Sequence, residues 1–189
     1  WMVAAGLALL GFSLWIPWLS ASRTTRIERR ADGVAHALLD AATPFPRPLD
    51  EADLQSVFAR TVALADARAV FVNDLERVEP APEGVWLCLR NKHYLFQLTE
   101  SPPEPNERPG RQTVPALEVT AWPIRSVGPG HCAFFYPEGA ERAYTRNLRR
   151  SYAGLDDRPG PGRSHRRPGL GGRQAGTYTG HDDERWILF

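Results

Sequence analysis

The stretch WMVAAGLALLGFSLWIPWL (Trp1–Leu19) decides the fold, because it passes without a turn signal into the Arg-rich stretch SASRTTRIERR (Ser20–Arg30). The first stretch contains no ionisable side chain. Nineteen helical residues at about 1.5 Å each span roughly 28 Å, close to the ~30 Å hydrocarbon core of a bilayer. Trp15 and Trp18 suit the aromatic belt at a membrane interface. The sequence therefore predicts a transmembrane anchor over residues 1–21, with the lipid bilayer as a partner.

A cleaved signal peptide is the alternative interpretation of this apolar run. The run is longer than a usual signal core, and no small-x-small cleavage site occurs before Ser20–Ser22. Both observations favour a retained anchor. Because the chain opens on Trp1 rather than Met, we expect its true start to lie upstream.

The next segment, residues 22–42, has the period of an amphipathic helix. Charged side chains occupy one face, and the helix is expected to end before Pro44, because proline disfavours helical backbone in the residue before it. Pro17, inside the preceding run, is expected to kink the helix and not to end it. The opposite face carries an apolar stripe that must dock on a sheet, made of Ile27, Ala31, Val34, Ala35, Leu38 and Ala42.

After a proline-rich linker over 43–49, Asp50 is a good N-cap for a second helix over 50–67. From residue 69 the apolar period changes to two, which predicts a sheet over 69–146. The resulting fold class is α+β, with the amphipathic helix packed on a four- to five-stranded antiparallel sheet. The strands are expected at 69–73, 84–90, 93–99, 117–122 and 132–136, with a short edge at 143–145.

The last part, residues 156–189, is Gly/Pro/Arg-rich and ends on the apolar run Arg185–Phe189. Too few apolar residues occur before that run to offset the entropy of ordering, so the sequence predicts a flexible tail. The alternative is a patch that binds an anionic partner. Nearby acids favour a solvated linker over that patch, whose arginines would be Arg158, Arg163, Arg166, Arg167 and Arg173.

The composition and the short motifs of the sequence indicate few binding or catalytic sites. The formal net charge of +1 offers no electrostatic argument for nucleic acid. Cys88 and Cys132 fit two buried thiols or one disulfide between strands, and their spacing does not fit a zinc site. The His181–Glu184 run (HDDE) is expected to be a solvated turn, since calcium loops alternate their ligands with spacers. No nucleotide-binding or nucleophile motif occurs, so we expect no enzyme, cofactor, metal or small-molecule substrate.

The stretch Ile16–Arg23, with Arg26, Arg29 and Arg30 after it, resembles the kinked, Arg-rich helix of the type IV pilin and type II secretion pseudopilin superfamily. The blocks 117–123 and 133–139 are similar to strands of its C-terminal sheet. The resemblance implies a pilin-like domain over residues 22–155 and an N-terminal helix that packs side by side with its neighbours. The packing residues would be Ala4, Ala5, Gly6, Ala8, Gly11, Trp15, Pro17 and Trp18.

Two family features do not occur in this sequence: the leader, and an acidic residue near the start of the membrane segment. If Pro17 marks the kink of the family, that acid would fall just upstream of Trp1. Arg23–Arg30 would hold the domain in the cytoplasm by the positive-inside rule, whereas a basic leader would compete with it. We expect an inner-membrane, single-pass protein with its domain on the periplasmic side.

The predicted function is therefore a non-enzymatic, membrane-anchored pilin-like or pseudopilin-like structural subunit of a cell-envelope assembly or secretion system. It would associate with itself or with other pilin-like subunits through the N-terminal helix. The alternative is a single-pass anchored binding module that does not polymerise and contacts an anionic partner through its basic tail.

Overall fold

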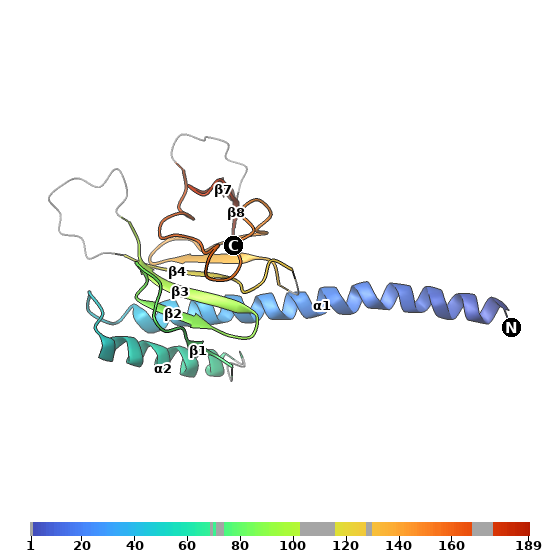
Figure 1. Ribbon diagram of the computed structural model, residues 1–189, viewed down its shortest axis with the longest axis horizontal. Coiled ribbons are helices and arrows are strands. Elements are labelled where there is room, and N and C mark those ends of the chain that lie inside the picture. Colours follow the sequence, from blue (N-terminus) through green and yellow to red (C-terminus); the bar gives the residue numbers. More distant parts are fainter. Residues whose placement is uncertain (1, 69, 71–73, 103–115, 128–129, 168–175) are drawn as a thin grey trace.

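The computed structural model describes residues 2–68, 70, 74–102, 116–127, 130–167 and 176–189, and for residues 2–20 it describes the backbone alone. These described residues form two helices and one sheet (Figure 1). The helices are α1 (Met2–Ala42) and α2 (Glu51–Ala67). The strands are β1 (Glu76–Arg77), β2 (Leu87–Arg90), β3 (Tyr94–Glu100), β4 (Leu117–Pro123), β5 (Ala133–Pro137), β6 (Ala143–Thr145), β7 (Thr177–Thr179) and β8 (Arg185–Leu188).

Among the described residues, no helix has the length and apolar character needed to cross a membrane. This finding overturns the predicted transmembrane anchor over residues 1–21 and the single-pass, inner-membrane location. The described side chains of α1 begin at Ala21, and this part of the helix carries Arg23, Arg26, Arg29 and Arg30, charges that a hydrocarbon core would penalise.

The sheet has eight antiparallel strands in the order β1-β2-β3-β4-β5-β6-β8-β7, so the prediction of four to five strands is wrong. Two of the additional strands, β7 and β8, come from the segment that was expected to be a flexible tail. They extend the sheet because β8 pairs with β6, with Ala143 opposite Leu188. The predicted strand at 69–73 falls on residues that, apart from Val70, lie outside the described part of the chain.

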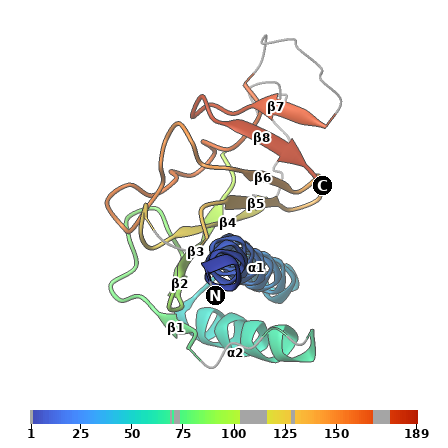
Figure 2. The same ribbon diagram turned by 90° about the vertical axis from the view of Figure 1, so that its right-hand side faces the viewer.

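Helix α1 lies between the sheet and α2, as the view along its axis shows (Figure 2). Its apolar stripe packs on the face of the sheet formed by alternate residues of β3 and β4, such as Phe96 and Val119. Helix α2 covers the other side of α1. Its first turn is fixed by a capping box, in which the side chains of Asp50 and Asp53 each accept a hydrogen bond from the backbone N–H of the other residue.

The second face of the sheet is covered by the chain that follows β6. Trp122 and Trp186 are fully buried there, and Tyr152 and Phe135 pack with them in a second apolar core. The segment from 146 to 167, together with β7 and β8, therefore belongs to the folded head. The correction has a physical cause: few apolar residues are needed here, because large aromatic rings bury much surface each.

Candidate functional site

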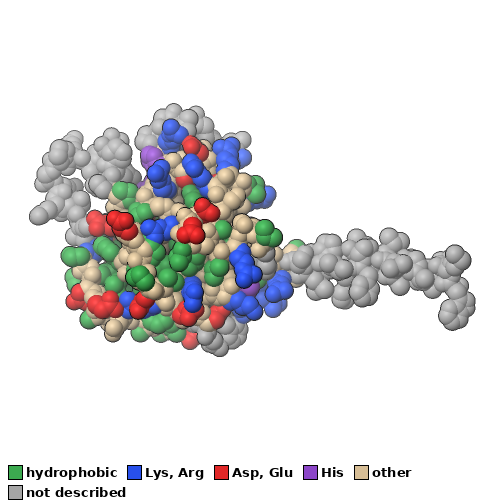
Figure 3. Space-filling view, viewed as in Figure 1, with side chains coloured by type: hydrophobic (Ala, Val, Ile, Leu, Met, Phe, Trp, Pro, Cys, Tyr) green, Lys and Arg blue, Asp and Glu red, His purple; other side chains and the backbone are tan. Residues whose placement is uncertain are grey.

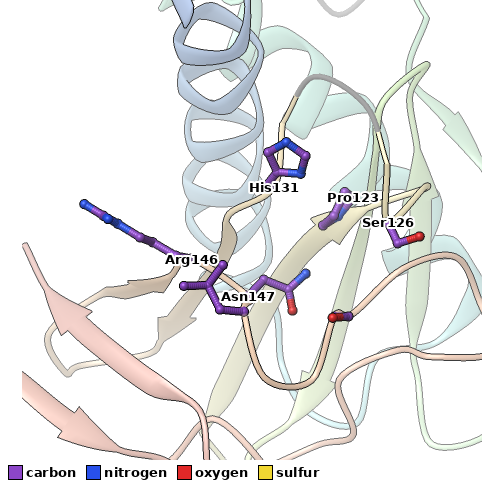
Figure 4. Close-up of a pocket in the computed structure, with 7 residues that line it drawn as sticks. Pro123, Ser126, His131, Arg146 and Asn147 are labelled. Atoms are coloured by element: carbon purple, nitrogen blue, oxygen red, sulfur yellow. The ribbon is translucent and has the colours of Figure 1, made fainter.

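A pocket of about 190 Å³ lies at the end of the head where α1 leaves it (Figure 4). The pocket sits between the loop that joins β4 to β5 and the loop that follows β6. It is lined by Pro123, Ser126, His131, Arg146, Asn147, Leu148 and Ser151.

The loop after β6 owes its shape to Asn147, whose backbone has φ 55° in the left-handed region. Asparagine tolerates that region better than most residues. Its side-chain amide donates to the carbonyl of Tyr152 at 2.9 Å and accepts from the N–H of Tyr152 at 2.7 Å. The amide is thus used to close the loop and is not offered to a ligand.

The loop between β4 and β5 lies close to α1 at Gly130, which has φ 93°. A Cβ atom at this position would lie 2.9 Å from the Cε2 atom of Tyr94 and 3.2 Å from the Cγ2 atom of Ile27. Glycine is therefore required both for the backbone angle and for the close approach of the loop to α1.

The lining of the pocket offers no pair of groups for acid–base catalysis. It contains no carboxylate, and His131 and both serines are exposed. The side chain of Arg146 points away from Asn147 and Ser126 (Figure 4). General acid–base chemistry needs a positioned donor and acceptor at hydrogen-bonding distance, and the described lining of this pocket does not supply such a pair.

Polar contacts next to the pocket join α1 to β5 and to the loop that precedes it. The Glu28 carboxylate accepts from the N–H of His131 at 3.0 Å and from that of Cys132 at 3.3 Å. One turn further along, Asp32 accepts from the hydroxyl of Tyr136, whose ring stacks on His36. Sequence reasoning placed Glu28 and Asp32 on the charged outer face of the helix, and the structure turns both toward the sheet.

Three side chains on the second face come together like a hydrolase triad. Ser101 Oγ lies 3.0 Å from His165 Nε2, and Glu118 Oε2 lies 2.7 Å from the same nitrogen. A proton relay needs the hydroxyl and the carboxylate on different ring nitrogens. The group therefore does not form a catalytic relay. Glu118 instead ties the covering segment to β4, since it also accepts from the N–H of Gly162 at 2.7 Å.

The His181–Glu184 run is not the solvated turn that the sequence predicts, because Asp182 and Glu184 are each only 2% exposed. Asp182 accepts from the Tyr152 hydroxyl at 2.7 Å, and Glu184 accepts from the N–H of Arg149 at 2.6 Å. Both carboxylates hold the loop after β6 onto β8. Among the described residues, no group of three or more His, Cys, Asp or Glu side chains is placed to hold a metal ion.

The residues predicted to dock the helix on the sheet, Ile27, Ala31, Val34, Ala35 and Leu38, are all buried in the first core. Those predicted for helix packing, Ala4, Ala5, Gly6, Ala8, Gly11, Trp15, Pro17 and Trp18, lie on the helical backbone of α1, and their side chains are outside the described part.

Cys88 and Cys132 are both free. They lie in different cores, since Cys88 belongs to the second and Cys132 packs against the first. Burial raises the pKa of Cys88 to about 11. Burial and, to a smaller extent, the negative charge of Glu28 together raise the pKa of Cys132 to about 12.

These raised pKa values predict slow alkylation of both thiols. At pH 8 the thiolate fraction of Cys88 would be about one in a thousand, and that of Cys132 about one in ten thousand. We expect iodoacetamide to leave both unmodified in the folded protein and to modify both after denaturation, as measured by mass spectrometry. Rapid labelling of the folded protein would contradict the burial of the two thiols.

Two of the tail arginines are engaged within the fold. Arg158 donates to the carbonyl of Glu83 at 3.1 Å, and Arg167 pairs with Asp183 at 2.8 Å. Arg163 and Arg166 are exposed, and Arg173 lies outside the described residues. Arg158 and Arg167 therefore make contacts within the fold, and binding of an anionic partner by these arginines stays a prediction.

Comparison of the chain with family models, with curated proteins and with solved structures gives no match.

Proposed function

We propose that this chain is a non-enzymatic, pilin-like structural subunit that assembles with copies of itself through the N-terminal half of α1. The observation that carries the proposal is the shape of α1, a single helix of 41 residues. Its second half is embedded in the head, and its first half extends away from the head (Figure 1).

The embedded half makes the head and the projecting half one mechanical unit. Val34, Ala35 and Leu38 are at most 1% exposed, and Glu28 adds hydrogen bonds to the β4–β5 loop. A helix fixed in this way carries any force on its projecting half directly into the core of the sheet. This coupling is what a subunit of an extended assembly needs.

The projecting half has the composition of a packing surface. The sequence of Met2–Leu19 is uncharged and includes Gly6 and Gly11. Small residues let two helix backbones approach closely. A helix in a protein gains most of its stability from packing its apolar surface, so a projecting apolar helix favours association with others of its kind.

Cysteine cross-linking tests this proposal. In a Cys132→Ser background, Gly6→Cys is expected to give disulfide-linked dimers of the full chain under mild oxidation, because neighbouring helices would lie side by side. The matched control is Gln55→Cys, on the exposed face of α2. Non-reducing gel electrophoresis measures the dimer fraction. Equal cross-linking at both positions, or none at Gly6→Cys, would contradict the proposal.

A further inference from the structure

The head carries opposite charges at its two ends. Lys and Arg side chains gather where the N-terminal half of α1 leaves the head, and acidic side chains gather at the opposite end (Figure 3). We call the first group the basic collar, which consists of Arg23, Arg26, Arg29, Arg30, Lys92 and Arg146. The second group, the acidic end, consists of Asp50, Glu51, Asp53 and Glu79.

The basic collar is built by three parts of the chain that meet at the exit of α1. The cations come from α1 itself, from the β2–β3 turn and from the loop after β6 that also lines the pocket. All six are exposed. Three of the cations act on His93: burial lowers the pKa of His93, and the positive charges of Lys92, Arg23 and Arg30 lower it further. Two acids accompany the collar, Glu28 and Asp74, of which Glu28 is bonded to the β4–β5 loop.

The acidic end is built where α1 finishes and α2 begins. Two of its four carboxylates contact Arg77, which lies 2.7 Å from Glu51 and 3.4 Å from Glu79, and the other two, Asp50 and Asp53, form the capping box of α2. The side chains of Glu51 and Glu79 remain 64% and 69% exposed. Arg77 is shared by Glu51 and Glu79, and the nearby Arg47 is paired with Glu138, so among the described side chains of this end the carboxylates outnumber the cations.

Within one molecule, the basic collar and the acidic end are too far apart to attract each other appreciably. The embedded part of α1, from Ile27 to Ala42, is about 22 Å long at 1.5 Å per residue. The Debye length at physiological salt is about 8 Å, so the two ends are screened from one another. A second copy of the chain, however, presents the matching charge at its other end.

We propose that the basic collar of one copy docks on the acidic end of the next. This inference rests on the proposed function and names the contact between heads that would accompany packing of α1. The contact is heterologous, because it joins two different surfaces. Such a contact leaves a free collar and a free acidic end on every pair, so further subunits can add until the rotation between them closes a ring, or without limit where it does not. The incoming head would lie beside the projecting half of α1, which leaves from the collar.

Charge reversal tests this contact. One variant carries Arg26→Glu and Arg29→Glu in the collar, and the other carries Glu51→Arg and Glu79→Arg at the acidic end. Each variant alone would bring like charges together, and we expect its self-association to weaken on the order of tenfold. Sedimentation velocity of the full chain at about 50 mM salt measures this, and the loss of wild-type association at about 500 mM salt provides a second readout.

An equal mixture of the two variants is the decisive sample. In the mixture every reversed surface meets an oppositely charged surface, so association is expected to return to the wild-type level. This recovery would also show that both variants fold. The matched control, Arg163→Glu with Arg166→Glu, reverses two exposed arginines elsewhere and is expected to leave association unchanged.

The outcomes separate this inference from the proposed function. If the wild-type chain associates but neither reversal weakens it, the head contact is wrong and packing through α1 remains. If only the collar variant weakens association and the mixture does not recover, the collar binds some other anion and the inference is overturned. If the wild-type chain does not associate at all, the proposed function itself fails.

Discussion

Val34→Asp is expected to abolish cooperative unfolding of the head. Val34 is 1% exposed and lies in the core between α1 and the sheet. A carboxylate placed there loses its hydration without gaining a partner, at a cost of about 4 kcal/mol or more. Small domains have only about 5–15 kcal/mol of stability, so the variant would be largely unfolded or detached from its helix.

Circular dichroism during heating measures this effect. The matched control is Ala59→Asp, which adds the same charge to an exposed position of α2 and should lower stability by about 0.5 kcal/mol through helix propensity alone. An unchanged melting curve for Val34→Asp would mean that α1 is not embedded in the head.

Trp186→Ala is expected to have the second largest effect. Trp186 is fully buried on β8. Its ring packs edge to face on that of Phe135, with 6.0 Å between the ring centroids, and its indole N–H donates to Asp182. Truncation of a buried tryptophan costs about 3–5 kcal/mol. It would also leave the buried Asp182 carboxylate with one donor fewer.

Urea unfolding of the full chain measures this loss. Leu155→Ala serves as the control, because Leu155 is 44% exposed and should contribute about 0.5 kcal/mol or less. A flexible tail would give the same unfolding midpoint for Trp186→Ala and the wild type. That result would contradict the inclusion of β7 and β8 in the folded sheet.

The helices are the part of the fold most readable from sequence, for local reasons. An amphipathic helix repeats its apolar residues every three or four positions, so Val34, Ala35 and Leu38 stand out as one stripe. Asp50 marks the start of α2, because it can accept a hydrogen bond from the backbone of Asp53. Neither signal needs information from elsewhere in the chain.

The far edge of the sheet could not be predicted, because it depends on contacts that are distant in sequence. Strand β7 has three residues, and β8 pairs with β6, which lies about forty residues earlier. The apolar run Arg185–Phe189 could be identified in the sequence, but the strand with which it pairs could not. A Gly/Pro/Arg-rich segment is typical of a linker, and only the aromatic side chains at its ends indicated a second core.

The burial of polar side chains could not be predicted from the sequence for a related reason. Asp182 and Glu184 are typical of a solvated turn, yet each accepts hydrogen bonds from groups about thirty residues away, including Tyr152 and Arg149. Such carboxylates are buried only because donors converge on them. The pocket was missed in the same way, since its lining comes from two loops whose proximity is set by the sheet.

We propose above that the projecting half of α1 brings copies of this chain together. Sedimentation velocity of the full chain over a range of concentrations tests it most directly, with Gly6→Leu and Gly11→Leu introduced together as the comparison. We expect concentration-dependent assemblies for the wild type, and weaker assembly for the double variant with an unchanged melting temperature. A wild-type chain that stays monomeric at every concentration, or a double variant that assembles equally well, would contradict the account.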